Sequence, residues 1–380
     1  MKFGLNNSDL KSNNTGIVLN LLLTGSASTR AELSSKSGLT KMTVSNIVGA
    51  LIQNDVLTET PLVVDNKPGR PTVRLSLSVK APKVISIYLN ESGTEVSLLD
   101  LSGTKIRSSS SNWDNLDAGV ISQKVFAAVD DLIRASINER ILCVSLVTSL
   151  PMDMTRSAIN LPDSSAFEFK SIMNERYGLN VVAEYEEISS ILSEFYFGTA
   201  KGIENTIYVS INQEIRSAAL VGGKPLLTGN GRSVKLEHVS IDYNGLSCSC
   251  GNRGCLQSYV SVEVMEKKLR DITKMKADFI GFCEMQQKKN DSRIDWALKD
   301  MMDKLGFALR SASMLIDPAA IIIGGIGAFI PDRYFTKLEK MLSDDQHAIT
   351  VVKEEVGEKR IGIVSLAPVL KQIFASEIVL

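Results

Sequence analysis

The first part of the chain spaces its apolar residues as amphipathic helices do. A helix capped by Thr40 places four apolar residues at i, i+3, i+4 and i+7, on one buried face: Val44, Ile47, Val48 and Leu51. An apolar run at residues 17–23 predicts an earlier helix, and Thr29-Arg30-Ala31-Glu32 has the form of a capping box that opens another. Gly38 supplies the turn before the last of these helices. The pattern therefore predicts three short helices.

Two alternating stretches follow these helices, at residues 56–59 and 72–78, and predict two strands joined by a loop. The loop contains Lys67-Pro68-Gly69-Arg70-Pro71. Helix, turn, helix and hairpin together predict a winged helix-turn-helix, whose second helix of the pair reads DNA. The helices alone would also suit a small bundle with a solvated face, and the prolines would also suit a stiff linker.

Short polar side chains lie on the third helix opposite its apolar stripe, where they can reach phosphates and base edges in a major groove. We expect Arg70, held between two prolines, to enter a narrow minor groove. The residues predicted to contact double-stranded DNA are Thr29, Arg30, Thr40, Lys41, Thr43, Ser45, Asn46 and Arg70.

From about residue 82 the chain alternates strand-like and helical segments, which is typical of an α/β domain. The helical segments are 120–137, one ending near Gly198, and one at 308–315. The strand-like segments are 84–88, 96–101, 141–149, 181–182, 206–211 and 320–323. Gly324-Gly325 follows the last strand and is interpreted as a tight turn.

Charge is distributed unequally along the chain. Residues 1–80 hold nine Lys or Arg against five Asp or Glu, and the remaining 300 residues hold 33 against 38, so the net charge of −1 conceals a basic head on an acidic body. This asymmetry favours a nucleic-acid-binding module joined to a second function. With 380 residues, 44% of them hydrophobic and 22% charged, the chain suits a soluble protein of two or three domains. It contains no apolar run of about 18 residues that would span a membrane.

Three of the five cysteines lie within eight residues, in the stretch 238–259, HVSIDYNGLSCSCGNRGCLQSY. One histidine and a C-x-C-x4-C loop supply the four N and S donors that a tetrahedral zinc ion requires. Cys248 and Cys250 are too close in sequence to pair comfortably in a disulfide. We predict a structural zinc site formed by His238, Cys248, Cys250 and Cys255; ordinary reduced thiols are the alternative.

The other two cysteines, Cys143 and Cys283, stand alone in apolar surroundings and are predicted core residues. Reduced thiols that can hold metal indicate the cytoplasm as the compartment.

The pattern His-x9-C-x-C-G-x-x-G-C-L, from His238 to Leu256, resembles the zinc signature of the ROK family, which contains bacterial repressors and sugar kinases on an actin-like ATPase fold. The segment RAELSSKSGLTKMTVSNIV, followed by GRP, resembles the DNA-binding half of ROK repressors. The resemblance implies an α/β chain with a winged helix-turn-helix at 1–80 and a two-lobed ROK fold. Its first lobe would occupy 81–200 and its second, zinc-holding lobe 201–380, with the last helix packing back on the first lobe.

ROK kinases hold phosphate with a D-x-G-G-T loop and a G-T-G-I-G loop. The matching positions here are Tyr88-Leu89-Asn90-Glu91-Ser92 and Asn212-Gln213-Glu214-Ile215-Arg216, which contain no glycine. Side chains there block the close backbone approach that phosphate binding needs, and Glu214 adds repulsion against ATP. We therefore expect that the chain is not an enzyme. A sugar kinase with an accessory DNA-binding head is the alternative. Gly324-Gly325 stands where the kinases approach adenosine, so the resemblance implies an adenosine contact as the alternative to a tight turn there.

The resemblance also implies an effector pocket. The family binds sugar with an Asn-Asp pair, the Glu and His of G-E-x-G-H and the Glu of C-L-E; the matching residues are Tyr185, Glu186, Lys235, His238 and Gln257. Only the histidine is unchanged, and one of its ring nitrogens would bind zinc while the other faces an effector. These residues would grip hydroxyls, or Lys235 would pair with an acidic effector. Alternatively, Lys235 and Glu186 neutralise each other and nothing small binds.

Taken together, these features predict a DNA-binding transcriptional regulator, a repressor of carbohydrate-utilisation genes that responds to a sugar or sugar-derived effector. Two heads on a homodimer would read a palindromic operator, and pairing of dimers into a tetramer is left open. Control by a protein partner in place of a metabolite is the alternative form of regulation.

Overall fold

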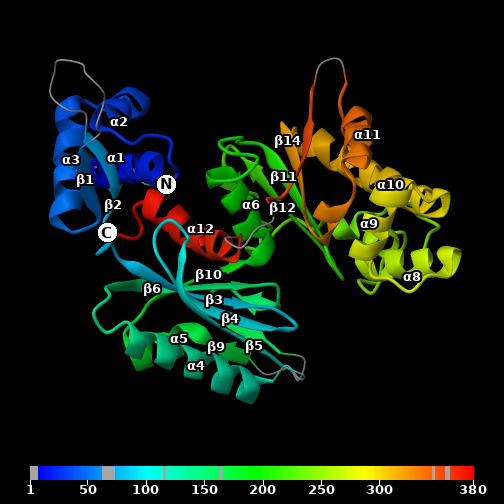
Figure 1. Ribbon diagram of the computed structural model, residues 1–380, viewed down its shortest axis with the longest axis horizontal. Coiled ribbons are helices and arrows are strands. Elements are labelled where there is room, and N and C mark those ends of the chain that lie inside the picture. The colour runs from blue at the N-terminus through cyan, green and yellow to red at the C-terminus, as the bar shows by residue number, and fades with distance from the viewer. Residues whose placement is uncertain (1–6, 62–72, 114–116, 162–165, 345–346, 356–359) are drawn as a thin grey trace. The chain divides into compact units, whose positions relative to one another are not determined.

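A computed structural model provides the structure, which describes residues 7–61, 73–113, 117–161, 166–344, 347–355 and 360–380 (Figure 1). The chain divides into two compact units, one comprising Met1–Glu186 with Glu358–Leu380 and the other Glu187–Gly357. Across these described ranges, none of the helices has the length and apolar character needed to cross a membrane.

The N-terminal head has the predicted order of three helices and a hairpin. Its elements are α1 (Asn7–Leu23), α2 (Arg30–Ser37), α3 (Lys41–Gln53), β1 (Leu57–Pro61) and β2 (Val73–Leu77), with the two strands antiparallel. The capping box is present, since Thr29 accepts from the Glu32 N–H and the Glu32 side chain accepts from the Thr29 N–H. The four predicted core residues of α3 are all buried. Helix α1 begins ten residues before the predicted start.

The first lobe is built on a five-stranded sheet in the order β10-β6-β3-β4-β5. The strands are β3 (Lys83–Leu89), β4 (Gly93–Leu99), β5 (Lys105–Asn112), β6 (Ile141–Thr148) and β10 (Val181–Tyr185). Strands β3, β4 and β5 form an antiparallel meander, whereas β6 and β10 run parallel to β3. Strand β3 is buried along its whole length, as expected for a central strand covered on both faces.

Helices cover both faces of this sheet. Helix α4 (Ala118–Ala135) packs on β4 and β5, and α5 (Phe169–Tyr177) packs on β10 and on a small sheet of β7 (Met152–Asp153), β8 (Ala158–Asn160) and β9 (Ala166–Glu168). The opposite face receives α12 (Arg360–Phe374), which comes from the far end of the chain and packs on β3, β6 and β10 (Figure 1).

The second unit also contains a five-stranded sheet, in the order β13-β12-β11-β14-β15. Its strands are β11 (Thr206–Ile211), β12 (Ile215–Val221), β13 (Lys224–Pro225), β14 (Ala320–Gly325) and β15 (Thr350–Lys353). Its helices are α6 (Glu186–Tyr196), α7 (Gln257–Val260), α8 (Val262–Thr273), α9 (Phe279–Lys289), α10 (Ser292–Ile316) and α11 (Asp332–Leu342), with short 3-10 turns at Leu236–His238 and Ile326–Phe329.

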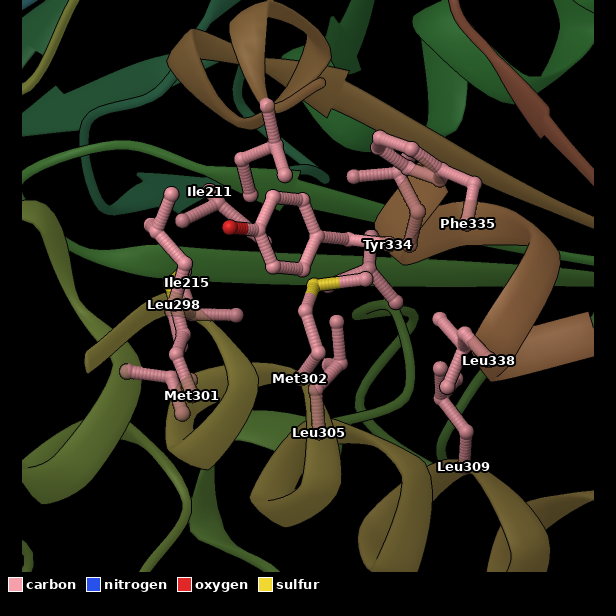
Figure 2. Close-up of a cluster of buried hydrophobic side chains, with 14 of the residues drawn as sticks. Ile211, Ile215, Leu298, Met301, Met302, Leu305, Leu309, Tyr334, Phe335 and Leu338 are labelled. Atoms are coloured by element: carbon pink, nitrogen blue, oxygen red, sulfur yellow. The ribbon is translucent and has the colours of Figure 1, made fainter. Parts of the chain in front are cut away.

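Helix α10 organises the core of this unit. It directs one apolar face at α11 and at the sheet, as Figure 2 shows for Leu298, Met301, Met302, Leu305 and Leu309 against Ile211, Ile215, Tyr334, Phe335 and Leu338. Cys143 and Cys283 are buried in the cores of their units, as predicted. The α/β fold class predicted from the sequence is confirmed, and most predicted strands and helices are found within a few residues of their expected ends.

Candidate functional site

The cysteine loop and the short 3-10 turn before it bring four potential metal ligands together. Two backbone hydrogen bonds fold the loop back on itself: the Gly251 N–H donates to Cys248 O at 3.0 Å, and the Cys248 N–H donates to Asn252 O at 2.9 Å. Gly254 has φ of 71°, and a Cβ there would lie 1.7 Å from Asp242 O. A side chain at this position is therefore excluded, which explains the glycine beside Cys255.

The four ligand atoms of His238, Cys248, Cys250 and Cys255 lie within 4.8 Å of one another. Cys248 Sγ is 3.7 Å from His238 Nδ1, and Cys250 Sγ is 3.6 Å from Cys255 Sγ. Tetrahedral bonds of about 2.3 Å from zinc to sulfur separate two sulfur ligands by about 3.8 Å. The donor set and its spacing therefore fit one tetrahedral ion.

The thiols of this cluster differ in their acidity when no metal charge is present. The Cys250 N–H, which hydrogen-bonds to Cys248, lowers the pKa of the Cys248 thiol to about 6. Burial raises the pKa of Cys255 to about 12. A divalent cation would supply the positive charge needed to hold all three groups as thiolates.

In the turn that matches the first kinase phosphate loop, an asparagine side chain accepts hydrogen bonds from the backbone of the turn. Tyr88 and Leu89 belong to β3, and Asn90 begins the turn into β4. Asn90 Oδ1 accepts from the Ser92 N–H at 2.9 Å and from the Gly93 N–H at 3.0 Å. The backbone donors that a phosphate would need are therefore engaged within the turn.

In the turn that matches the second phosphate loop, between β11 and β12, the polar side chains also have protein partners. Asn212 Oδ1 accepts from the Ile326 N–H at 3.1 Å, and Asn212 Nδ2 donates to Ser210 Oγ at 2.9 Å. Glu214 forms an ion pair with Arg216 at 3.0 Å. The hydrogen bond from Ile326 ties the turn to the end of β14.

The glycine pair at the end of β14 lies against side chains of the same unit. Gly325 has φ of 64°, and its N–H donates to the buried carboxylate of Glu354 at 2.9 Å. A Cβ at Gly324 would lie 2.4 Å from Tyr208 Oη, and one at Gly325 would lie 2.6 Å from Asn212 Oδ1. The packing requires glycine at both positions, and the positive φ favours it at Gly325, where β14 ends and the 3-10 turn Ile326–Phe329 begins.

The predicted effector residues of the first unit already have protein partners. Tyr185 is buried, and its hydroxyl donates to Met152 O at 2.8 Å. Glu186 accepts from the Tyr88 hydroxyl and lies 3.7 Å from the Arg360 guanidinium. Burial and the Glu186 charge raise the pKa of Tyr88 well above its usual range, so its hydroxyl keeps its proton and remains a donor.

The other predicted effector residues belong to the second unit. Lys235 is exposed and precedes the 3-10 turn that ends at His238, which is partly buried and directs Nδ1 at Cys248. Gln257 is partly buried and begins α7, two residues after Cys255. A pocket formed by both groups, and a pairing of Glu186 with Lys235, stay predictions.

The predicted DNA-binding residues divide into two sets. Thr29 is buried as the α2 cap, and Arg30 pairs with Glu59 of β1. The exposed residues of α3 and its cap include Thr40, Lys41, Ser45 and Asn46, while Thr43 is partly buried and bonds Thr40 through their hydroxyls at 2.9 Å. Arg70 lies outside the described residues.

Sequence reasoning did not assign three residues to the sites where the structure places them. Met42 is 75% exposed on the outer face of α3. Its position outside the apolar stripe of this helix is the sequence feature that could have indicated it. Arg360 and Tyr88 contact Glu186 from distant parts of the chain, so no local pattern indicates them.

Comparison with known proteins agrees with this architecture. The ROK family matches residues 95–360. The chain belongs to the ROK family. One relative is the xylose repressor of Bacillus subtilis (strain 168), 27% identical over 322 residues that cover 83% of this chain and 82% of the relative.

Two solved ROK structures show the same fold. A ROK family transcriptional regulator, described as a homologue of the E. coli MLC protein, superposes with a TM-score of 0.79 at 19% identity and covers 97% of each chain. The ROK hexokinase from Thermus thermophilus has a TM-score of 0.63 at 20% identity, and covers 75% of this chain and 96% of its own. The ROK fold is therefore shared with both a regulator and a kinase.

Proposed function

We propose that this ROK protein is a DNA-binding transcriptional regulator that represses carbohydrate-utilisation genes. The observation that carries the proposal is the exposed polar face of α3 in a head of three helices and a two-stranded hairpin, joined to a ROK body. Such a helix enters a major groove in winged helix-turn-helix proteins. The match to a xylose repressor over 83% of this chain supports the same function and a sugar effector.

The body acts as a sensor and has no kinase activity. Asn90 accepts two backbone N–H groups of the first matching turn, Asn212 of the second turn accepts the Ile326 N–H, and Glu354 accepts the Gly325 N–H. A phosphate would have to displace these acceptors and would meet the negative charge of Glu354. The likeness to kinase structures supports the alternative of a sugar kinase, but that likeness concerns the fold.

A structural zinc ion is held by His238, Cys248, Cys250 and Cys255, whose ligand atoms have the spacing of a tetrahedral site. The ion would cross-link the cysteine loop to the 3-10 turn that ends at His238. Because Nδ1 of His238 faces the cluster, Nε2 is left to donate to an effector hydroxyl.

The effector is a sugar or sugar derivative bound by Tyr185, Glu186, Lys235, His238 and Gln257. Two heads of a homodimer, or of a tetramer built from dimers, read a palindromic operator in the cytoplasm. The effector acts by binding one arrangement of the protein more tightly than the other.

Operator binding tests the proposal. Duplexes retained from fragmented genomic DNA by the purified protein would provide the operator, and fluorescence anisotropy would give Kd at several salt concentrations. Lys41→Ala should weaken binding on all sequences and lower the slope of log K against log salt by about one. Lys340→Ala, at an exposed lysine of α11, is the matched control and should leave both unchanged.

Two further outcomes would decide against the proposal. Retention of no duplex would contradict DNA binding, and ADP release with any sugar of a panel containing xylose, glucose and N-acetylglucosamine would support the kinase alternative.

Arg70→Ala should weaken binding several-fold, more on A·T-rich sites, and an unchanged Kd would contradict the minor-groove role.

A further inference from the structure

Glu186 lies at the start of a chain of contacts within the first unit. Its carboxylate accepts from the Tyr88 hydroxyl and pairs with Arg360 at 3.7 Å. The side chains of Arg360 and Glu186 are only 19% and 16% exposed, so their attraction is less screened than that of a surface pair. A ligand hydroxyl that donates to Glu186 competes with these partners for the carboxylate oxygens.

Arg360 is the first residue of α12, and α12 is fixed to the sheet along its length. A Cβ at Gly362 would lie 2.2 Å from Gly103 O, so the first turn of the helix contacts the β4–β5 turn directly. The buried Ser145 hydroxyl donates to Ser365 O, and Lys371 pairs with the buried Glu184 at 2.8 Å. The helix therefore has little freedom to move except as one body.

The other end of α12 is attached to the head. A Cβ at Gly16 of α1 would lie 2.2 Å from Phe374 O, so the two helices touch backbone to backbone. Just beyond the helix, Ser376 Oγ donates to Ser12 O at 2.6 Å. With 15 residues, α12 spans about 22 Å between Glu186 and α1.

We propose that α12 transmits the state of Glu186 to the DNA-binding head, with Arg360 as the residue that senses it and the Gly16–Phe374 contact as the point of attachment. The proposal rests on the proposed function and adds its route of regulation. An effector that engages Glu186 weakens its hold on Arg360, and the first turn of α12 shifts. Because the helix is packed tightly at both ends, the shift reaches α1 and reorients α3.

A double-mutant cycle tests this route without requiring the effector. Arg360→Gln imitates the loss of the pairing, and should raise the Kd for an operator duplex, selected with the wild-type protein, about threefold or more. Gly16→Ala forces the two helices apart, and Ser376→Ala removes the hydrogen bond without crowding. In either background, Arg360→Gln should lose most of its effect on Kd, which is the signature of coupled residues.

Two arginine variants serve as controls. Arg156→Gln removes an ion-paired arginine of the same unit that lies off α12, and should leave Kd unchanged. Arg140→Gln removes a different contact between lobe and head, the donation to Asn54 O at 3.3 Å, and should not suppress the effect of Arg360→Gln.

The outcomes separate the two proposals. If the wild-type protein retains no duplex, the proposed function fails. If it binds and Arg360→Gln leaves Kd unchanged, or if Arg360→Gln and Ser376→Ala have additive effects, the route through α12 is wrong while the regulator function stands. Hydrogen exchange gives an independent readout, because Glu186→Gln should change protection of the α1 amides.

Discussion

The cysteine loop and the two turns that match phosphate loops use backbone and side chains in opposite ways. In the cysteine loop, backbone hydrogen bonds and a side-chain-free Gly254 leave four donor atoms facing one another within 4.8 Å. In the two turns, an asparagine side chain accepts backbone N–H groups. Asn90 accepts those of Ser92 and Gly93 in its own turn, and Asn212 accepts that of Ile326 beyond the end of β14. The cysteine loop directs four potential metal ligands at a single point, whereas the two turns engage their asparagine side chains in hydrogen bonds with the protein's own backbone.

Under the proposed function, this difference explains how the fold keeps its stability without a bound phosphate. An N–H left without phosphate in a partly buried turn would cost free energy, so an asparagine that accepts it stabilises the turn and excludes the ligand at once. The cysteines differ, because three adjacent thiolates would repel one another, so all three can ionise together only around a cation.

The largest effect is expected where the cluster is broken. Cys255→Ser replaces a buried sulfur ligand, and should abolish an equimolar zinc content and lower the unfolding midpoint by about 6 °C or more, or about 3 kcal/mol. Metal analysis and calorimetry measure both quantities. Ser249→Ala, between two of the ligands and exposed, should keep the ion; equal stability of the two variants would contradict a structural metal.

An intermediate effect is expected at the second turn. Asn212→Ala leaves the part-buried Ile326 N–H without its acceptor, which should lower the free energy of unfolding by about 1–3 kcal/mol in urea titrations. The exposed neighbour Gln213→Ala should change it by less than about 0.5 kcal/mol. ATP should still give no thermal shift in Asn212→Ala, because Glu354 still accepts the Gly325 N–H; a clear shift would show that Asn212 alone closes the site.

The smallest effect is expected at the first turn. Asn90→Ala removes an acceptor of two N–H groups in a turn that water can reach, so the loss should be about 0.5–1 kcal/mol in the same titrations. Ser92→Ala keeps its N–H and should be neutral. If Asn90→Ala lowers the free energy of unfolding as much as Asn212→Ala does, water is excluded from the first turn as well as from the second.

Much of the head and of the cysteine loop was predictable because their signals are local. Thr29 and Glu32 lie three residues apart and form the cap that the sequence predicts, and the stripe from Val44 to Leu51 is buried on one helix face. The spacing of residues did not reveal that the Arg30 side chain would be engaged in an ion pair, because its partner Glu59 lies 29 positions later in the chain, in β1.

The sequence by itself determined the caps, the helix faces, the ligand spacing of the cysteine loop and the absence of glycine from the positions that match two phosphate loops. Each of these depends on residues within a few positions of one another. Only the tertiary structure decided which side chains contact Glu186 and which contacts attach the head to α12. Tyr88 reaches Glu186 across 98 positions, and Ser376 reaches Ser12 across 364. Such contacts follow from the packing of α12 on the sheet and on α1, which no local pattern encodes.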